Sequence, residues 1–109
     1  MLVSTRSETQ VARALASRLL TEVGGGTTAR LLTGFRLCTS RLPDERELEV
    51  LTRVYAEQRD HYDANPRAAE ELVAVGESAI PAELDPTELA AWTAVCSVLL
   101  SLDATLHRG

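Results

Sequence analysis

Residues 85–103 read DPTELAAWTAVCSVLLSLD, and this stretch decides the fold of the chain. Asp85 can cap a helix, Pro86 suits the first helical position, and Glu88 stands where a capping box places a carboxylate. The residues that follow are apolar around most of the helix circumference and include the only tryptophan, Trp92. Because so apolar a helix must be covered on most sides, we expect it at the centre of the fold. We expect Trp92 to be buried against one of the first two helices.

The rest of the chain also follows a helical pattern. Apolar residues recur at helical spacing in four further segments separated by Gly and Pro, and no segment alternates as a strand would. The expected helices run from about residue 6 to 22, from 28 to a corner at 41–43, from 44 through Tyr62, and from Pro66 to Gly76. Together with the last helix they predict an all-α bundle of about five helices, forming a single domain over residues 1–109.

Local signals mark several of these helix ends. Thr5 with Glu8, and Asp44 with Glu47, have the spacing of a capping box. The glycines at 24–26 end the first helix. A phosphate-binding loop before the second helix is an alternative there, but it would need the lysine of a P-loop and a preceding strand. We therefore interpret the glycines as an interhelical turn.

Composition narrows the class of protein and of partner. The chain has 109 residues, 45% hydrophobic and 25% charged, which is typical of a globular domain. Its net charge of -5 argues against nucleic acid and anionic membranes as partners, since both attract basic surfaces. No stretch approaches the roughly 20 apolar residues of a membrane span. The polar residues from Ser4 to Gln10 do not fit a signal peptide.

Few residues have the pattern of a reactive site. Glu57 and His61 lie one helical turn apart, but a di-iron bundle needs such a motif from two helices and two further glutamates. His107 lies near a helix C-terminus, where a positive charge interacts favourably with the helix dipole. The sequence contains no Cys-x-x-Cys-His for haem attachment and no Gly-x-Ser-x-Gly elbow. We expect no catalytic residue, no metal site and no cofactor.

The two cysteines are far apart in the sequence. Cys38 and Cys96 both fall on apolar helical faces, so we expect both to be buried as small hydrophobic side chains. A disulfide between them would require the two helices to be in contact with suitable geometry.

Four segments carry a family resemblance. Residues Phe35–Leu48, Gly76–Ser78, Glu88–Thr93 and Leu99–Asp103 resemble the C-terminal part of the planctomycete-specific domain of unknown function. That domain closes large cell-envelope proteins that often begin with a cytochrome c module. The resemblance implies that this chain is the last part of a larger domain, in a cell-envelope or periplasmic context, without the haem-bearing module.

The resemblance also singles out residues. The family usually has Asn where Ser101 stands and Glu where Ala104 stands, so only Asp103 can be carried over from that polar group. We expect Asp103 to pair with Arg36 or Arg41, because the family motifs hold both ends of this contact. The candidate structural or interaction residues are therefore Phe35, Arg36, Arg41, Trp92 and Asp103.

These observations predict a non-catalytic structural or protein-interaction module. One alternative is a lobe of an envelope enzyme that acts with redox modules on polysaccharide or envelope substrates, and another is a stand-alone helical adaptor. Titratable residues in a concave pocket would favour the enzyme lobe, whereas an exposed apolar patch would favour docking. The expected partners are the missing segments of the parent domain or a second copy. We expect the stripe from Val11 to Leu20 on the first helix to be the exposed remnant that binds them.

Overall fold

The computed structural model describes residues 8–74 and 84–108, with side chains for residues 10–74 and 84–102. This part of the chain forms helices and contains no strand, which confirms the predicted all-α bundle. The helices are α1 (Glu8–Glu22), α2 (Thr27–Thr39), α3 (Glu45–Ala64), α4 (Pro66–Val73) and α5 (Pro86–Arg108).

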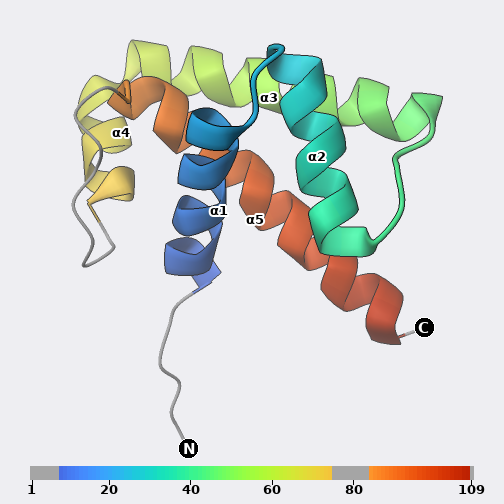
Figure 1. Ribbon diagram of the computed structural model, residues 1–109. Coiled ribbons are helices and arrows are strands. Elements are labelled where there is room, and N and C mark those ends of the chain that lie inside the picture. The colour runs from blue at the N-terminus through green and yellow to red at the C-terminus, as the bar shows by residue number, and fades with distance from the viewer. Residues whose placement is uncertain (1–7, 75–83, 109) are drawn as a thin grey trace, which may run out of the picture.

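Helix α5 lies at the centre of the bundle, as its composition predicts. It contacts each of the other four helices, most extensively α1 and α3. Figure 1 shows α3 lying across one end of the bundle, with α5 running obliquely beneath it and α1 and α2 packed against one side of α5.

The core is built mainly on α5. The buried hydrophobic side chains of the core come from all five helices. They are Ala12, Ala16, Leu19, Leu31, Phe35, Leu51, Ala69, Val73, Leu89, Ala90, Trp92, Val95, Cys96 and Leu99. Trp92 is fully buried, as predicted, but its aromatic neighbour is on α3 rather than on α1 or α2. The ring centroids of Trp92 and Tyr55 are 5.0 Å apart and the rings are tilted by 36°. This geometry is typical of favourable aromatic pairs.

The stripe on α1 is not the exposed face that the sequence predicts. Ala12, Ala16 and Leu19 are fully buried, and of the stripe's larger hydrophobic side chains Val11 alone is exposed. Because two of the buried residues are alanines, α1 can approach its neighbour closely, and it packs chiefly on α5. The prediction of a docking face on α1 is therefore wrong.

Helix α2 also approaches its neighbours closely, at Gly34. A Cβ atom there would lie 3.1 Å from methyl carbons of both Leu19 on α1 and Leu99 on α5. Such a distance is shorter than a comfortable carbon–carbon contact. The missing side chain of Gly34 therefore lets α2 sit where α1 and α5 meet.

The residues at 24–26 form an interhelical turn, as predicted. Gly25 and Gly26 have φ values of 97° and 94°, which favour glycine because it has no Cβ. The Arg30 Nε of α2 donates hydrogen bonds to the carbonyl oxygens of Leu19, at 3.2 Å, and Val23, at 3.1 Å. The Leu19 carbonyl also accepts the Val23 N–H, so Arg30 adds hydrogen bonds at the end of α1 and joins α2 to it.

The helix starts confirm one capping box in full. The Asp44 side chain accepts a hydrogen bond from the Glu47 backbone N–H, and the Glu47 carboxylate accepts one from the Asp44 N–H. At the start of α5, Asp85 Oδ1 accepts from the Thr87 N–H at 3.3 Å, which caps the helix. The predicted box at Thr5 and the predicted helix end at Gly76 lie outside the described residues.

Trp92 should make a large contribution to stability. We expect Trp92→Ala to lower the free energy of unfolding by about 3 to 5 kcal/mol, because the substitution leaves a cavity in a close-packed core. Urea denaturation followed by far-ultraviolet circular dichroism measures the loss. Leu37→Ala is the control, since Leu37 is 54% exposed and should change stability by less than about 0.5 kcal/mol. Equal midpoints for Trp92→Ala and the control would contradict the prediction.

Candidate functional site

The predicted site residues fall in different places. Phe35 and Trp92 are buried in the core, on α2 and α5. Arg36 is exposed and lines a shallow hollow with Thr33, Leu37 and Ser40. Arg41 lies in the connection between α2 and α3, and the Asp103 side chain lies outside the described part of the chain. Of the four whose side chains are described, the structure brings Arg41 and Phe35 into contact.

Arg41 contacts two residues close to it in the structure, Glu47 and Phe35. Its guanidinium donates two hydrogen bonds to the Glu47 carboxylate, at 2.9 and 2.8 Å, and lies 4.9 Å from the centroid of the Phe35 ring. Such a bidentate contact between a guanidinium and a carboxylate is strong and directional. The structure gives Glu47 as a partner of Arg41, and the pairing of Asp103 with Arg36 or Arg41 stays a prediction, because the Asp103 side chain lies outside the described residues.

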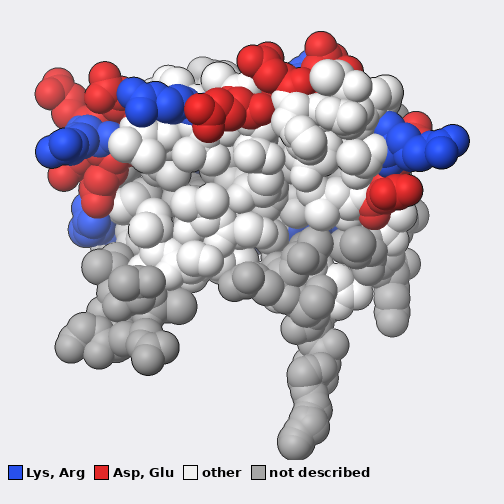
Figure 2. All heavy atoms as spheres, turned by 180° about the vertical axis from the view of Figure 1, so that it is seen from behind, with Lys and Arg blue, Asp and Glu red and all other residues white. Residues whose placement is uncertain are grey.

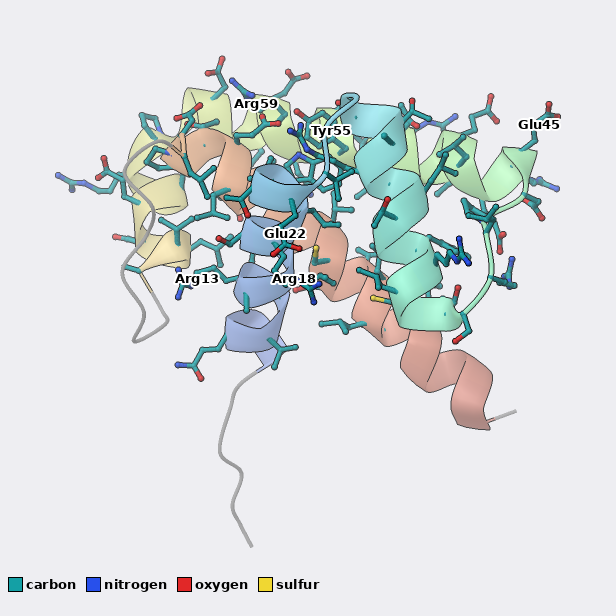
Figure 3. The ribbon with its side chains drawn as sticks, viewed as in Figure 1. Arg13, Arg18, Glu22, Glu45, Tyr55 and Arg59 are labelled. Atoms are coloured by element: carbon teal, nitrogen blue, oxygen red, sulfur yellow. The ribbon has the colours of Figure 1, made fainter. Side chains whose placement is uncertain are left out.

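A polar cluster that the sequence did not predict joins α3 to α5. The Glu88 carboxylate accepts hydrogen bonds from the Tyr55 hydroxyl at 2.8 and 3.0 Å, from Trp92 Nε1 at 3.1 Å, and from the Arg59 guanidinium. Figure 3 shows Tyr55 and Arg59 on α3. Burial, reinforced by the Glu88 carboxylate, raises the pKa of the Tyr55 hydroxyl. The spacing of Tyr55 from Arg59, and of Glu88 from Trp92, is one helical turn in each case, which was the available signal.

The hydrogen bonds of this cluster indicate a structural role. Together, the two carboxylate oxygens of Glu88 accept hydrogen bonds from three side chains. Nη2 of Arg59 also lies 3.8 Å from Oδ2 of Asp85. Most of the lone pairs of this carboxylate are therefore already engaged in hydrogen bonds within the fold. The cluster satisfies the buried indole N–H of Trp92 and fixes how α3 crosses α5.

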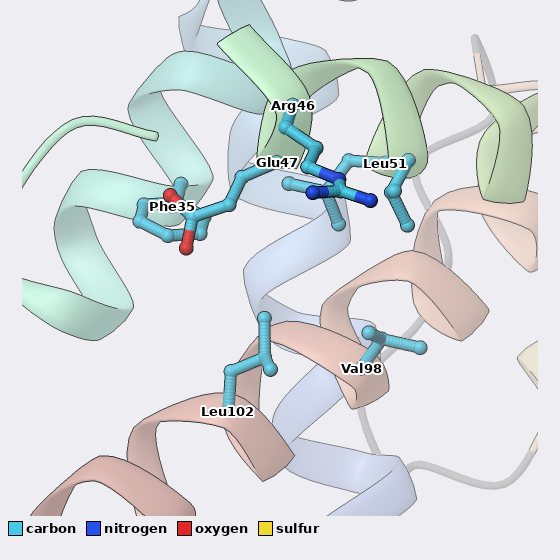
Figure 4. Close-up of a pocket in the computed structure, with 7 residues that line it drawn as sticks. Phe35, Arg46, Glu47, Leu51, Val98 and Leu102 are labelled. Carbon is cyan, nitrogen blue, oxygen red and sulfur yellow. The ribbon is translucent and has the colours of Figure 1, made fainter. Parts of the chain in front are cut away.

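Another feature that the sequence did not predict is an apolar groove between α2, α3 and α5. It has a volume of about 300 Å³ and is lined by Phe35, Arg46, Glu47, Val50, Leu51, Val98 and Leu102. Figure 4 shows Val98 and Leu102 projecting from α5 on one side, with Phe35 and Leu51 on the other and Arg46 beside the opening. The floor is buried, since Phe35 and Leu51 are at most 3% exposed.

The side chains at the edges of this groove are unusually exposed for hydrophobic residues. Val50 is 47% exposed, Leu102 38% and Val98 37%. In the described part of the chain these three make up half of the six large hydrophobic side chains that are exposed, the others being Val11, Leu37 and Leu42. Exposed hydrophobic residues that gather in one place are typical of interaction sites. The groove is therefore the candidate functional site.

The remaining reactive side chains do not gather in the described residues. Glu57 and His61 are exposed on α3, and no group of three potential metal ligands occurs among the described residues. Cys38 is half-buried and Cys96 is buried, and both are free thiols. Burial raises the pKa of the Cys96 thiol, which makes it unreactive. Among the described helices, none combines the length and apolarity that crossing a membrane requires.

The Glu88 cluster should couple α3 to α5 energetically. In a double-mutant cycle of Tyr55→Phe and Glu88→Gln we expect a coupling energy of about 1 to 2 kcal/mol, since a hydrogen bond to a charged, largely buried group is stronger than an exposed one. The matched control is the Arg18–Glu22 pair on α1, whose side chains are 62% and 60% exposed and should couple by less than about 0.5 kcal/mol. Coupling in the cluster no larger than in this pair would contradict its role.

The Arg41–Glu47 contact predicts a pH dependence. The hydrogen bonds from Arg41, followed by that from the Asp44 N–H, lower the pKa of Glu47 from 4.5 to about 2. Because the folded-state pKa is the lower one, the stabilisation is complete above about pH 4.5 and is lost as the pH falls toward 2. Carboxyl carbon NMR should show this low titration, and Arg41→Gln should move it upward. A Glu47 titration near 4.5 in the unsubstituted chain would contradict the contact.

No family model matches the chain, and neither a curated protein nor a solved structure does. The fold, the Glu88 cluster and the apolar groove are therefore the features from which a function is inferred.

Proposed function

We propose that this chain is a non-catalytic protein-interaction module that binds an apolar surface of another polypeptide in the groove between α2, α3 and α5. The observation that carries the proposal is the groove itself, a hollow with a buried apolar floor and the exposed edges Val50, Val98 and Leu102. Burying such side chains against a partner removes apolar area from water, which is favourable.

Charged side chains border the groove, whereas its floor is apolar, since Arg46 and Glu47 line it beside the buried Phe35 and Leu51. Seen from the side opposite to Figure 1, charged side chains gather along the α3 edge and at the two flanks, and the surface below that edge carries almost none (Figure 2). Protein interfaces are commonly depleted of charge at their centre and polar at their rim.

The titratable residues of the groove support docking rather than an enzyme lobe. Arg46 and Glu47 are the charged side chains that line it. Glu47 is held ionised by Arg41, with a pKa of about 2, which is poorly matched to proton transfer near neutral pH. The alternative of an envelope enzyme would need a general acid or base in the hollow.

The family resemblance gives the proposal a context. In a large cell-envelope protein, the apolar surface bound in the groove would belong to preceding segments of the same parent domain. In a stand-alone adaptor it would belong to a separate chain. Both occupants would use the same groove, with Phe35 at its floor, and Arg41 would support that floor by stacking on the ring.

A neutral hydrophobic dye tests whether the groove is a binding surface. We expect Nile red fluorescence to rise with the unsubstituted chain at low protein concentration, and to lose most of this increase in Val98→Arg and Leu102→Arg, because a charge in the groove disfavours apolar ligands. Leu37→Arg is the matched control, since Leu37 is also exposed but lies outside the groove. Circular dichroism verifies that all variants fold. Equal dye binding in the groove variants and the control would overturn the proposal.

A further inference from the structure

The groove places two requirements on its occupant. The occupant must present apolar side chains to the hollow, because Phe35, Leu51 and Val98 line it. It must also place a carboxylate beside Arg46. The other charged residue of the groove, Glu47, already accepts two hydrogen bonds from Arg41. Arg46 makes no ion pair within the described part of the chain, so it is the cation that an occupant would meet.

The chain itself carries a surface that meets both requirements. On α3, exposed Val50 directly follows Glu49, and Glu49 lines a second, polar hollow with Glu45 and Arg46. Arg46 thus borders both hollows, with an apolar edge on one side and carboxylates on the other. A surface that holds both members of each complementary pair can bind a copy of itself about a two-fold axis.

Resting on the proposed function, we infer that the occupant of the groove is a second copy of this chain. The two α3 helices run antiparallel about an axis close to residue 48, so that Val50 of each copy enters the hollow beside Arg46 of the other. Arg46 of each copy then meets Glu49 of the second copy, which forms two equivalent ion pairs at the rim. The exposed edge of Val98 and Leu102 is covered in the same step.

The net charge of -5 acts against this association, because both copies are acidic. A small interface opposed by long-range repulsion binds weakly, so we expect a dissociation constant on the order of micromolar. Added salt screens the net repulsion between the copies and the two rim ion pairs alike.

Complementary charge reversal tests the geometry. Arg46→Glu places two carboxylates opposite each other in the homodimer, and Glu49→Arg places two guanidinium groups there. We expect each variant alone to dimerise at least about tenfold more weakly than the unsubstituted chain, since like charges at a contact disfavour it. When the two variants are mixed, each rim pair again joins opposite charges. The mixture should therefore form a heterodimer, which poor folding of either variant cannot produce.

Sedimentation equilibrium over about 1 µM to 1 mM protein measures these affinities, with circular dichroism as the folding control. Leu102→Arg should abolish the dimer and Leu37→Arg should leave it intact. A monomer at every concentration, or a dimer insensitive to Leu102→Arg and to charge reversal, would overturn the inference. Nile red separates the two proposals: dye binding by a chain that stays monomeric retains the docking groove and rejects self-association, whereas a monomer that binds no dye rejects both.

Discussion

The need to cover α5 is the constraint on which the rest of the structure depends. This helix is apolar around most of its circumference, and its side chains Leu89, Trp92, Val95 and Leu99 are fully buried. Burying one large apolar side chain is worth about 1.5 to 3 kcal/mol. The other four helices each contribute buried side chains to the core, and each packs against α5.

Covering α5 also buries a polar group, the indole N–H of Trp92, and the Glu88 cluster provides its hydrogen-bond acceptor. The indole N–H of Trp92 would be unsatisfied in an apolar core, and an unpaired buried donor is destabilising. Glu88 accepts this hydrogen bond from one turn away, and Tyr55 and Arg59 bring α3 to the same carboxylate. Because hydrogen bonds are directional whereas apolar contacts are not, the cluster fixes how α3 crosses α5.

The cover on α5 is uneven along its length. Around Trp92 the helix is sealed by α3, and its polar cluster closes the contact. Further along, Val98 and Leu102 face the groove that also borders Phe35 of α2 and Val50 of α3. The apolar side chains of α5 thus hold the bundle together around Trp92 and line the groove further along the helix. Arg41 stiffens that place by joining the start of α3 to the Phe35 ring.

Two helix starts with the same spacing show what local sequence can and cannot predict. Asp44 and Glu47 form the predicted capping box, because every atom involved lies within four residues of the chain. Glu88 has the same position after Asp85, yet its carboxylate binds Tyr55 and Arg59, which are 33 and 29 residues away. The spacing alone did not contain these partners, since they reach Glu88 only after α3 has crossed α5.

The sequence by itself determined the helices, the turn at Gly25 and Gly26, and the central place of α5, because periodicity, caps and glycine conformation are local properties. Tertiary structure decided which apolar faces remain exposed. It buried the α1 stripe through Ala12 and Ala16 and left Val50, Val98 and Leu102 at the edges of a groove. The physical reason is that a hydrophobic side chain has no directional preference for its partner, so its exposure depends on how helices distant in the sequence pack.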